Sequence, residues 1–124
     1  MTTLNYLLLA VAEPRKSGAL YSKLLGLDPV DTSDTFVLFA LPSGLKIGLW
    51  LAGEMEPKVG TADGIDISFS EPDYHAVKTT YAAWKGLGLR ILQEPTEMDF
   101  GFTFTAADPD GHRLRVFALG DNPR

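Results

Sequence analysis

The hydrophobic pattern of the first half of the chain predicts a strand, a helix and two further strands. An apolar run over residues 4–11 has strand length, and it ends at Glu13-Pro14, where a proline suits the first turn of a helix. The apolar face of this helix is expected at Leu20, Leu24 and Leu25, and its end at Gly26. Strands are predicted over 36–41 and 45–51, with a turn at 42–44 between them.

The second half repeats this order. An alternating strand over 65–69 ends at Ser70-Glu71-Pro72-Asp73, which carries the same Glu-Pro pair and reads as a Ser-x-x-Asp capping box. The predicted helix that follows has an aromatic and apolar stripe at spacings of three and four: Tyr74, Val77, Tyr81 and Trp84. Gly86 and Gly88 end it, and strands are then expected from 89–92, at 102–106 and at 113–119.

The repeat predicts the fold class and the organisation of the chain. Each half reads as one strand, one helix and about three strands, and repeats of this length are units that pack on each other. We therefore expect an α+β domain over residues 1–124, made of two tandem βαβββ modules whose curved sheets enclose a cleft. Module 1 spans 1–51, a linker with Gly53, Pro57 and Gly60 spans 52–63, and module 2 spans 64–124.

Strand alternation predicts which side chains face this cleft. In the last strand, Leu114 and Val116 should face the helix, and Arg113, Arg115 and Phe117 the other side. In the 45–51 strand, Lys46, Gly48 and Trp50 should share the open face. Phe102 and Phe104 share one side of their strand, but a single step of register decides which side that is.

Composition excludes several classes of protein. The 124 residues carry a formal charge of −5 with scattered basic residues, which argues against nucleic-acid binding. No apolar run approaches the roughly 18 residues of a membrane span, so no membrane association is expected. The chain has no cysteine, which removes disulfides, thiolate metal sites and cysteine nucleophiles, and fits a cytoplasmic location.

Two stretches resemble signatures of the vicinal oxygen chelate superfamily, which includes glyoxalase I, extradiol dioxygenases, fosfomycin-resistance enzymes and bleomycin-resistance proteins. They are Ser17-x-x-x-Tyr21-x-x-Leu24-Leu25-Gly26 and Asp108-Pro109-Asp110-Gly111-His112-x-Leu114. Trp50 near the linker and Asp99-Phe100-Gly101 look most similar to the branch of phenazine- and bleomycin-binding resistance proteins. The resemblance covers essentially the whole chain and implies paired modules and a homodimer.

The same resemblance implies where a divalent metal would be bound in the superfamily's enzymes: on the first, fourth, fifth and eighth strands. Here those positions read Tyr6, Gly48, Asp66 and Arg115. Arginine has no lone pair to donate, and a competent site needs about three good ligands. We therefore expect no metal, no cofactor and no catalytic residue. The alternative that stays open is a metal-dependent lyase or dioxygenase with atypical ligands.

Without a metal, the cleft becomes a candidate pocket for a planar aromatic molecule. Its predicted lining residues are Trp50, Tyr6, Gly48, Phe36, Asp66, Phe100, Phe102 and Arg115, and a loop over 93–100 would close it. Trp50 is the expected stacking platform, with ordinary core or dimer interface as the alternative. Asp66 and Arg115 are expected to pair, either as a structural bracket or with one of them meeting a polar group of the ligand.

The sequence thus predicts a metal-free protein that sequesters a small aromatic molecule, with antibiotic resistance as one role. A third possibility is a weak binder whose role is to pair with another protein. The sequence shows no basic or amphipathic partner helix to support it.

Overall fold

The computed structural model describes residues 2–60 and 64–120. The chain divides into two compact units, an N-terminal unit of residues Met1–Gly60 and a C-terminal unit of residues Thr61–Arg124. The boundary between them falls inside the linker predicted at 52–63. Residues 61–63 of that linker, and residues 1 and 121–124 of the predicted modules, lie outside the described residues.

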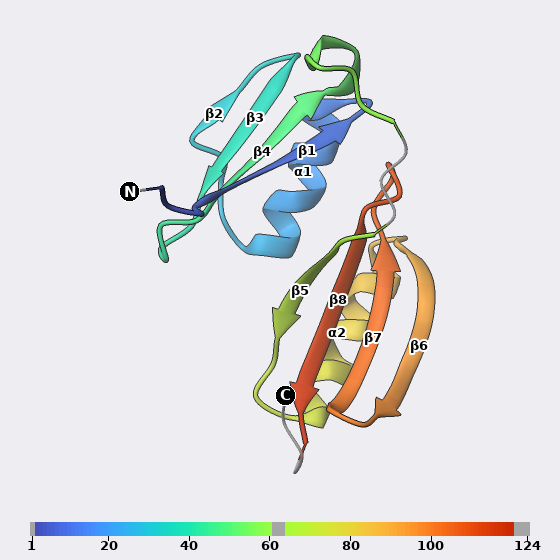
Figure 1. Cartoon of the computed structure of the whole chain (residues 1–124). Helices are drawn as coiled ribbons and strands as arrows, with labels where there is room; N and C mark the ends of the chain where they lie inside the picture. The colour runs from blue at the N-terminus through green and yellow to red at the C-terminus, as the bar shows by residue number, and fades with distance from the viewer. Residues whose placement is uncertain (1, 61–63, 121–124) are drawn as a thin grey trace. The chain divides into compact units, whose positions relative to one another are not determined.

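The N-terminal unit is a four-stranded mixed sheet with one helix against it (Figure 1). Its elements are β1 (Tyr6–Val11), α1 (Pro14–Leu25), β2 (Asp31–Thr32), β3 (Phe36–Ala40), β4 (Lys46–Leu51) and the short η1 (Ala52–Glu54). The strand order is β1-β4-β3-β2, with β1 parallel to β4 and the other neighbours antiparallel. The sequence pattern missed β2, whose two residues are both exposed and polar.

Helix α1 begins at Pro14 and ends at Gly26, as predicted, but its most buried face is not the expected one. The buried residues are Pro14, Ser17, Gly18 and Tyr21, whereas the three predicted leucines are half-buried. Gly18 explains the difference, because a Cβ built on it would lie 3.0 Å from Cγ1 of Val37 in β3. The missing side chain lets the helix backbone approach the sheet at Gly18.

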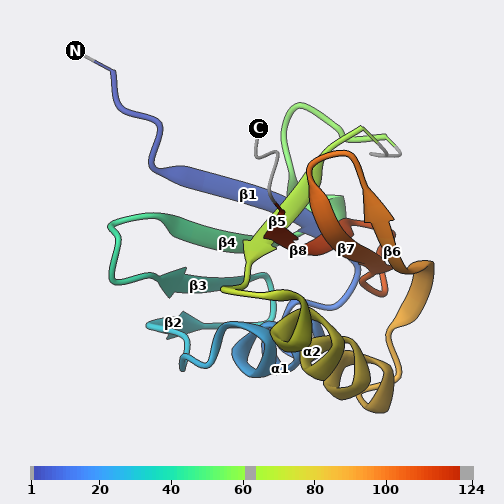
Figure 2. The ribbon, with the colours of Figure 1, turned by 90° about the horizontal axis from the view of Figure 1, so that it is seen from below.

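The C-terminal unit repeats the topology, which confirms the predicted repeat. Its elements are β5 (Asp66–Ser70), α2 (Tyr74–Gly86), β6 (Arg90–Met98), β7 (Gly101–Ala107) and β8 (Arg113–Leu119), in the sheet order β5-β8-β7-β6. In Figure 2, α2 lies on one side of this sheet, as α1 lies on one side of the N-terminal sheet. Asp73, not Ser70, caps α2: its Oδ1 accepts a hydrogen bond from the Ala76 backbone N–H at 2.8 Å.

The predicted stripe of α2 packs on the sheet through aromatic contacts. Tyr74 stacks on Phe102 with ring centroids 5.0 Å apart. The Phe104 ring lies edge-on to both Tyr81 and Trp84, at 5.3 and 5.5 Å. Phe102 and Phe104 therefore face the helix, and the register left open by the sequence is settled.

Strand β6 replaces the loop that was predicted to run from Gln93 to Phe100. It pairs with β7 as far as Met98, with register shifts on either side of Gln93. β6 is an edge strand with β7 as its neighbour, so it tolerates Pro95 and an irregular ladder. The predicted loop is thus wrong, because this stretch pairs with β7 as far as Met98.

The α+β fold class is confirmed, with the apolar core of each unit lying between its sheet and its helix. The cleft predicted between the two curved sheets stays a prediction. No helix within residues 2–60 and 64–120 is both long and apolar enough to cross a membrane.

Candidate functional site

The face of the N-terminal sheet opposite α1, hereafter the aromatic face, carries four of the predicted ligand-binding residues. Val37 faces α1, so Phe36 and Leu38 on the same strand point to the opposite side. The register places Gly48 beside Leu38 and Leu8, and Trp50 beside Phe36. We define the aromatic face by Tyr6, Leu8, Phe36, Leu38, Gly48 and Trp50; Lys46, which pairs with Tyr6, lies on the same side of the sheet.

Gly48 leaves room on this face, but the room is taken by the protein's own side chains. A Cβ at Gly48 would lie 2.8 Å from both Cζ of Phe36 and Cδ2 of Leu8. Phe36 in turn meets Trp50 edge-on, with ring centroids 6.5 Å apart. The glycine therefore seats the Phe36 ring beside Trp50. This arrangement gives no support for a ligand ring entering at Gly48.

The aromatic face remains partly accessible. Tyr6 is 37% exposed and Leu8 48% exposed, and Trp50 is half-buried. Exposed apolar side chains that lie side by side, instead of singly, mark a surface that can bind another apolar molecule.

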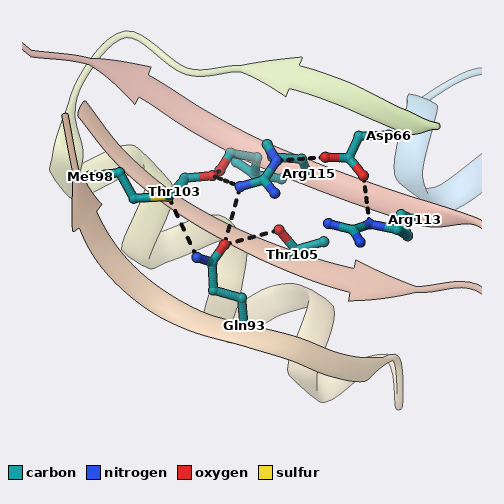
Figure 3. A network of polar contacts seen from close by, with 8 residues as sticks. Asp66, Gln93, Met98, Thr103, Thr105, Arg113 and Arg115 are labelled. Carbon is teal, nitrogen blue, oxygen red and sulfur yellow. Dashed lines mark hydrogen bonds and ion pairs between the residues drawn. The ribbon is translucent and has the colours of Figure 1, made fainter. Parts of the chain in front are cut away.

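The face of the C-terminal sheet opposite α2 carries charge, and its centre is an Asp66–arginine cluster (Figure 3). Nε of Arg115 donates a hydrogen bond to Oδ2 of Asp66 at 2.8 Å, so the predicted pairing of these two residues is present. Nε of Arg113 lies 2.6 Å from the other carboxylate oxygen, Oδ1, as an ion pair without hydrogen-bond geometry. The Asp66 carboxylate is thus held between two guanidinium groups.

Polar side chains of β6 and β7 extend this cluster. Nη1 of Arg115 donates to Oε1 of Gln93 at 3.1 Å and to Oγ1 of Thr103 at 3.2 Å. Thr105 donates its hydroxyl hydrogen to the same Gln93 oxygen at 3.1 Å. Alternation puts the threonines of β7 on the face opposite Phe102 and Phe104, which is why they meet Arg115.

The electrostatics of the cluster favour an ionised Asp66. Burial by itself would raise the pKa of Asp66, but the hydrogen bond and charge of Arg115 and the charge of Arg113 outweigh it and hold the pKa below its usual value. The side chains of Arg115 and Asp66 are only 19% and 27% exposed, so water screens their attraction incompletely. One carboxylate and two guanidinium groups leave this face with an excess positive charge.

The cluster's residues do not fit a divalent metal. Both Asp66 oxygens already contact guanidinium nitrogen atoms, and the neighbouring cations would repel a metal ion. Within residues 2–60 and 64–120, no three His, Cys, Asp or Glu side chains gather in a way that could hold a metal ion. The four strand positions implied by the superfamily resemblance therefore supply one carboxylate and no second strong ligand.

The sequence placed Arg113 and Phe117 on this face but missed their contacts. Arg113 was not expected as a second partner of Asp66, and Phe117 was expected there without a role. The Phe117 ring meets the ring of Phe100, from the turn between β6 and β7, edge-on at 6.3 Å. Phe102, a predicted ligand-binding residue whose face the sequence left open, lies on the α2 side of the sheet, where it stacks on Tyr74.

Comparison with known proteins places the chain in a family. The profile of the glyoxalase/bleomycin resistance protein/dioxygenase superfamily matches residues 3–116. The chain is 28% identical over 120 residues to the phenazine antibiotic resistance protein EhpR of Enterobacter agglomerans, covering 94% of this chain and 92% of that one.

Solved structures of similar proteins share the fold of this chain. The solution NMR structure of protein ATC0852 from Agrobacterium tumefaciens is 45% identical with a TM-score of 0.89, covering 97% of this chain and 99% of that chain. A glyoxalase-related enzyme from Fulvimarina pelagi shares the fold, with a TM-score of 0.82 at 16% identity, covering 100% of this chain and 96% of that chain. The chain belongs to the glyoxalase/bleomycin resistance protein/dioxygenase superfamily.

Proposed function

We propose that this protein binds a small planar aromatic compound without a metal, and that it thereby confers resistance to an antibiotic of that kind. The observation that carries the proposal is the Asp66 carboxylate, which the superfamily resemblance places at a metal position and which two arginines hold instead. An ion pair there removes the ligand on which metal chemistry would depend. Similarity to a phenazine resistance protein supports the choice of ligand class.

The aromatic face supplies the second support. Trp50 and Phe36 meet edge-on, and the partly exposed Leu8 and Tyr6 lie further along the same face. Aromatic side chains bind flat rings through buried area and through offset or edge-on ring contacts. We therefore assign ligand stacking to Trp50, with Phe36 as its neighbour and Tyr6 four residues away along the sheet.

A fluorescence titration tests this assignment. The second tryptophan, Trp84, is 5% exposed and packed against Phe69 and Phe104, so Trp84→Phe leaves Trp50 as the sole indole reporter. The probes are phenazine, phenazine-1-carboxamide, phenazine-1-carboxylate and bleomycin. Binding of one of them should quench Trp50 emission and raise Tm by about 10 °C at a hundredfold excess over Kd.

Matched variants separate the aromatic face from general surface effects. Trp50→Ala should weaken probe binding at least tenfold, and Trp50→Phe should weaken it less because a ring remains. Val30→Ala is the control, since Val30 is a 63% exposed apolar residue of the same unit outside β1, β3 and β4. If no probe changes emission or Tm, the proposal is wrong for this ligand class.

Metal analysis tests the enzymatic alternative. Protein purified without chelators should hold no stoichiometric iron, manganese, nickel or zinc, and probe binding should be unchanged by EDTA. Stoichiometric metal that is lost in Asp66→Asn would support a metal-dependent lyase or dioxygenase instead.

We also propose that the protein is a cytoplasmic homodimer, as the superfamily resemblance implies and as the absence of cysteine fits. Light scattering on the eluting protein should give twice the chain mass. The chain mass itself would contradict the dimer.

A further inference from the structure

The two arginines of β8 have more hydrogen-bond donors than the described residues use. Arg115 uses Nε and Nη1 in the contacts with Asp66, Gln93 and Thr103, and Arg113 directs Nε at Asp66. Within residues 2–60 and 64–120, Nη2 of Arg115 and both Nη atoms of Arg113 make no hydrogen bond. Each guanidinium is therefore fixed at one end while N–H groups at the other end stay available.

The positive charge of this face also favours binding of an anion. Asp66 neutralises one of the two arginines, so the cluster carries an excess positive charge on a chain whose formal net charge is −5. A carboxylate suits such a pair of planar groups, because it accepts two parallel hydrogen bonds and brings the missing negative charge.

Phe117 provides an apolar contact next to the arginines. It is two residues beyond Arg115 on the same face of β8, about 6.6 Å along the strand. It is half-buried, and its ring is held edge-on by Phe100. The face of the C-terminal unit thus combines cationic donors with an aromatic wall at neighbouring positions.

From this arrangement we infer that the C-terminal unit binds an aromatic carboxylate: the guanidinium groups of Arg113 and Arg115 take the carboxylate, and Phe117 with Phe100 takes the ring. The inference rests on the proposed function, since it specifies the charge class of the aromatic ligand. Asp66 orients both arginines and limits the charge that they present.

A pair of probes of equal shape tests the inference on the unmodified protein. 2-Naphthoate and 2-naphthamide share their ring system and differ in charge. The naphthoate should bind about tenfold to a hundredfold more tightly, the factor expected for hydrogen bonds to a charged group. It should also shift the Nε–Hε NMR signals of Arg113 and Arg115, and its affinity should fall as salt is added.

Two substitutions should change this preference in opposite directions. Arg113→Gln removes the excess charge while leaving the Arg115–Asp66 hydrogen bond in place, so the naphthoate should lose most of its advantage. Asp66→Asn removes the internal counter-charge, so the naphthoate should bind several-fold more tightly than to the unmodified protein. Arg90→Gln, at the exposed first residue of β6, is the control for net charge and should change neither affinity.

The outcomes separate this inference from the proposed function. Equal affinity for naphthoate and naphthamide on the unmodified protein overturns the inference, whatever the variants do, while phenazine quenching of Trp50 would still support the proposed function. An Asp66→Asn variant that binds naphthoate more weakly also overturns it. A naphthoate preference lost in Arg113→Gln, with no phenazine probe affecting Trp50, would uphold carboxylate recognition and reject the proposed stacking site.

Discussion

Gly101, the first residue of β7, should not tolerate even one added methyl group. Its φ is 150°, and a Cβ built there would lie 2.0 Å from the backbone oxygen of Ala118 on the paired strand β8 and 2.8 Å from the Gly120 nitrogen. A carbon–oxygen contact normally needs about 3.3 Å, so the strands would have to part by more than an ångström. In Gly101→Ala, backbone strain and overpacking of about 1–3 kcal/mol each give a loss of about 4 kcal/mol.

Separation of the two strands would also disturb the face of the C-terminal sheet that carries Phe117. The Gly120 N–H donates to the Phe100 carbonyl oxygen at 2.9 Å, so parting the strands moves the Phe100 ring away from Phe117. Urea unfolding followed by far-UV circular dichroism measures the free energy of unfolding. Gly86→Ala is the matched control: a Cβ there meets nothing within 4 Å, and alanine at the end of α2 should be neutral or stabilising by up to about 1 kcal/mol. A Gly101→Ala protein within about 1 kcal/mol of the unmodified one would refute the reasoning.

Three further predictions follow from buried and charged positions. The pKa of Asp66 is lowered on folding, so its ionisation adds stability above its unfolded pKa of about 3.9, and this contribution is lost as pH falls through the lower folded value. The difference in unfolding free energy between the unmodified protein and Asp66→Asn should therefore shrink between pH 7 and pH 3. A constant difference would contradict this reasoning. Phe104→Ala should cost about 3–5 kcal/mol in urea unfolding, since its ring is fully buried against α2, and a cost below about 1 kcal/mol would show that this contact is unimportant. Gly48→Ala should displace Phe36, change the near-UV circular dichroism of Trp50 and cost about 1–3 kcal/mol; an unchanged spectrum would contradict the close approach.

Repetition and periodicity made much of the fold predictable from the sequence. The Glu-Pro pairs and the alternating strands predicted both units, and the stripe from Tyr74 to Trp84 predicted the buried face of α2. The buried face of α1 was missed because, besides Tyr21, it is made of Pro14, Ser17 and Gly18 and carries no leucine. Leucines suggested another face, but the close approach of Gly18 to Val37 decides the packing, and hydrophobicity alone does not encode it.

The candidate site was only partly predictable. Asp66 and Arg115 could be paired because an isolated buried charge is costly, and the pair is present. The second arginine, Arg113, adds its contact through side-chain geometry that the strand pattern does not specify. The face of Phe102 stayed open because one step of register exchanges the two faces of β7, and the contact with Tyr74 that fixes it is visible only in the folded unit.

In each unit, one face of the sheet packs on the helix, and the opposite face carries the candidate site residues. The charged and polar residues around Asp66 lie on β5, β6 and β8, on the face of the sheet opposite Phe104, Leu114 and Val116, which are fully buried. Substitutions on this face could therefore change ligand specificity without repacking the core. A combinatorial library confined to positions 66, 93, 113 and 115 would explore new ligand charges on an intact scaffold.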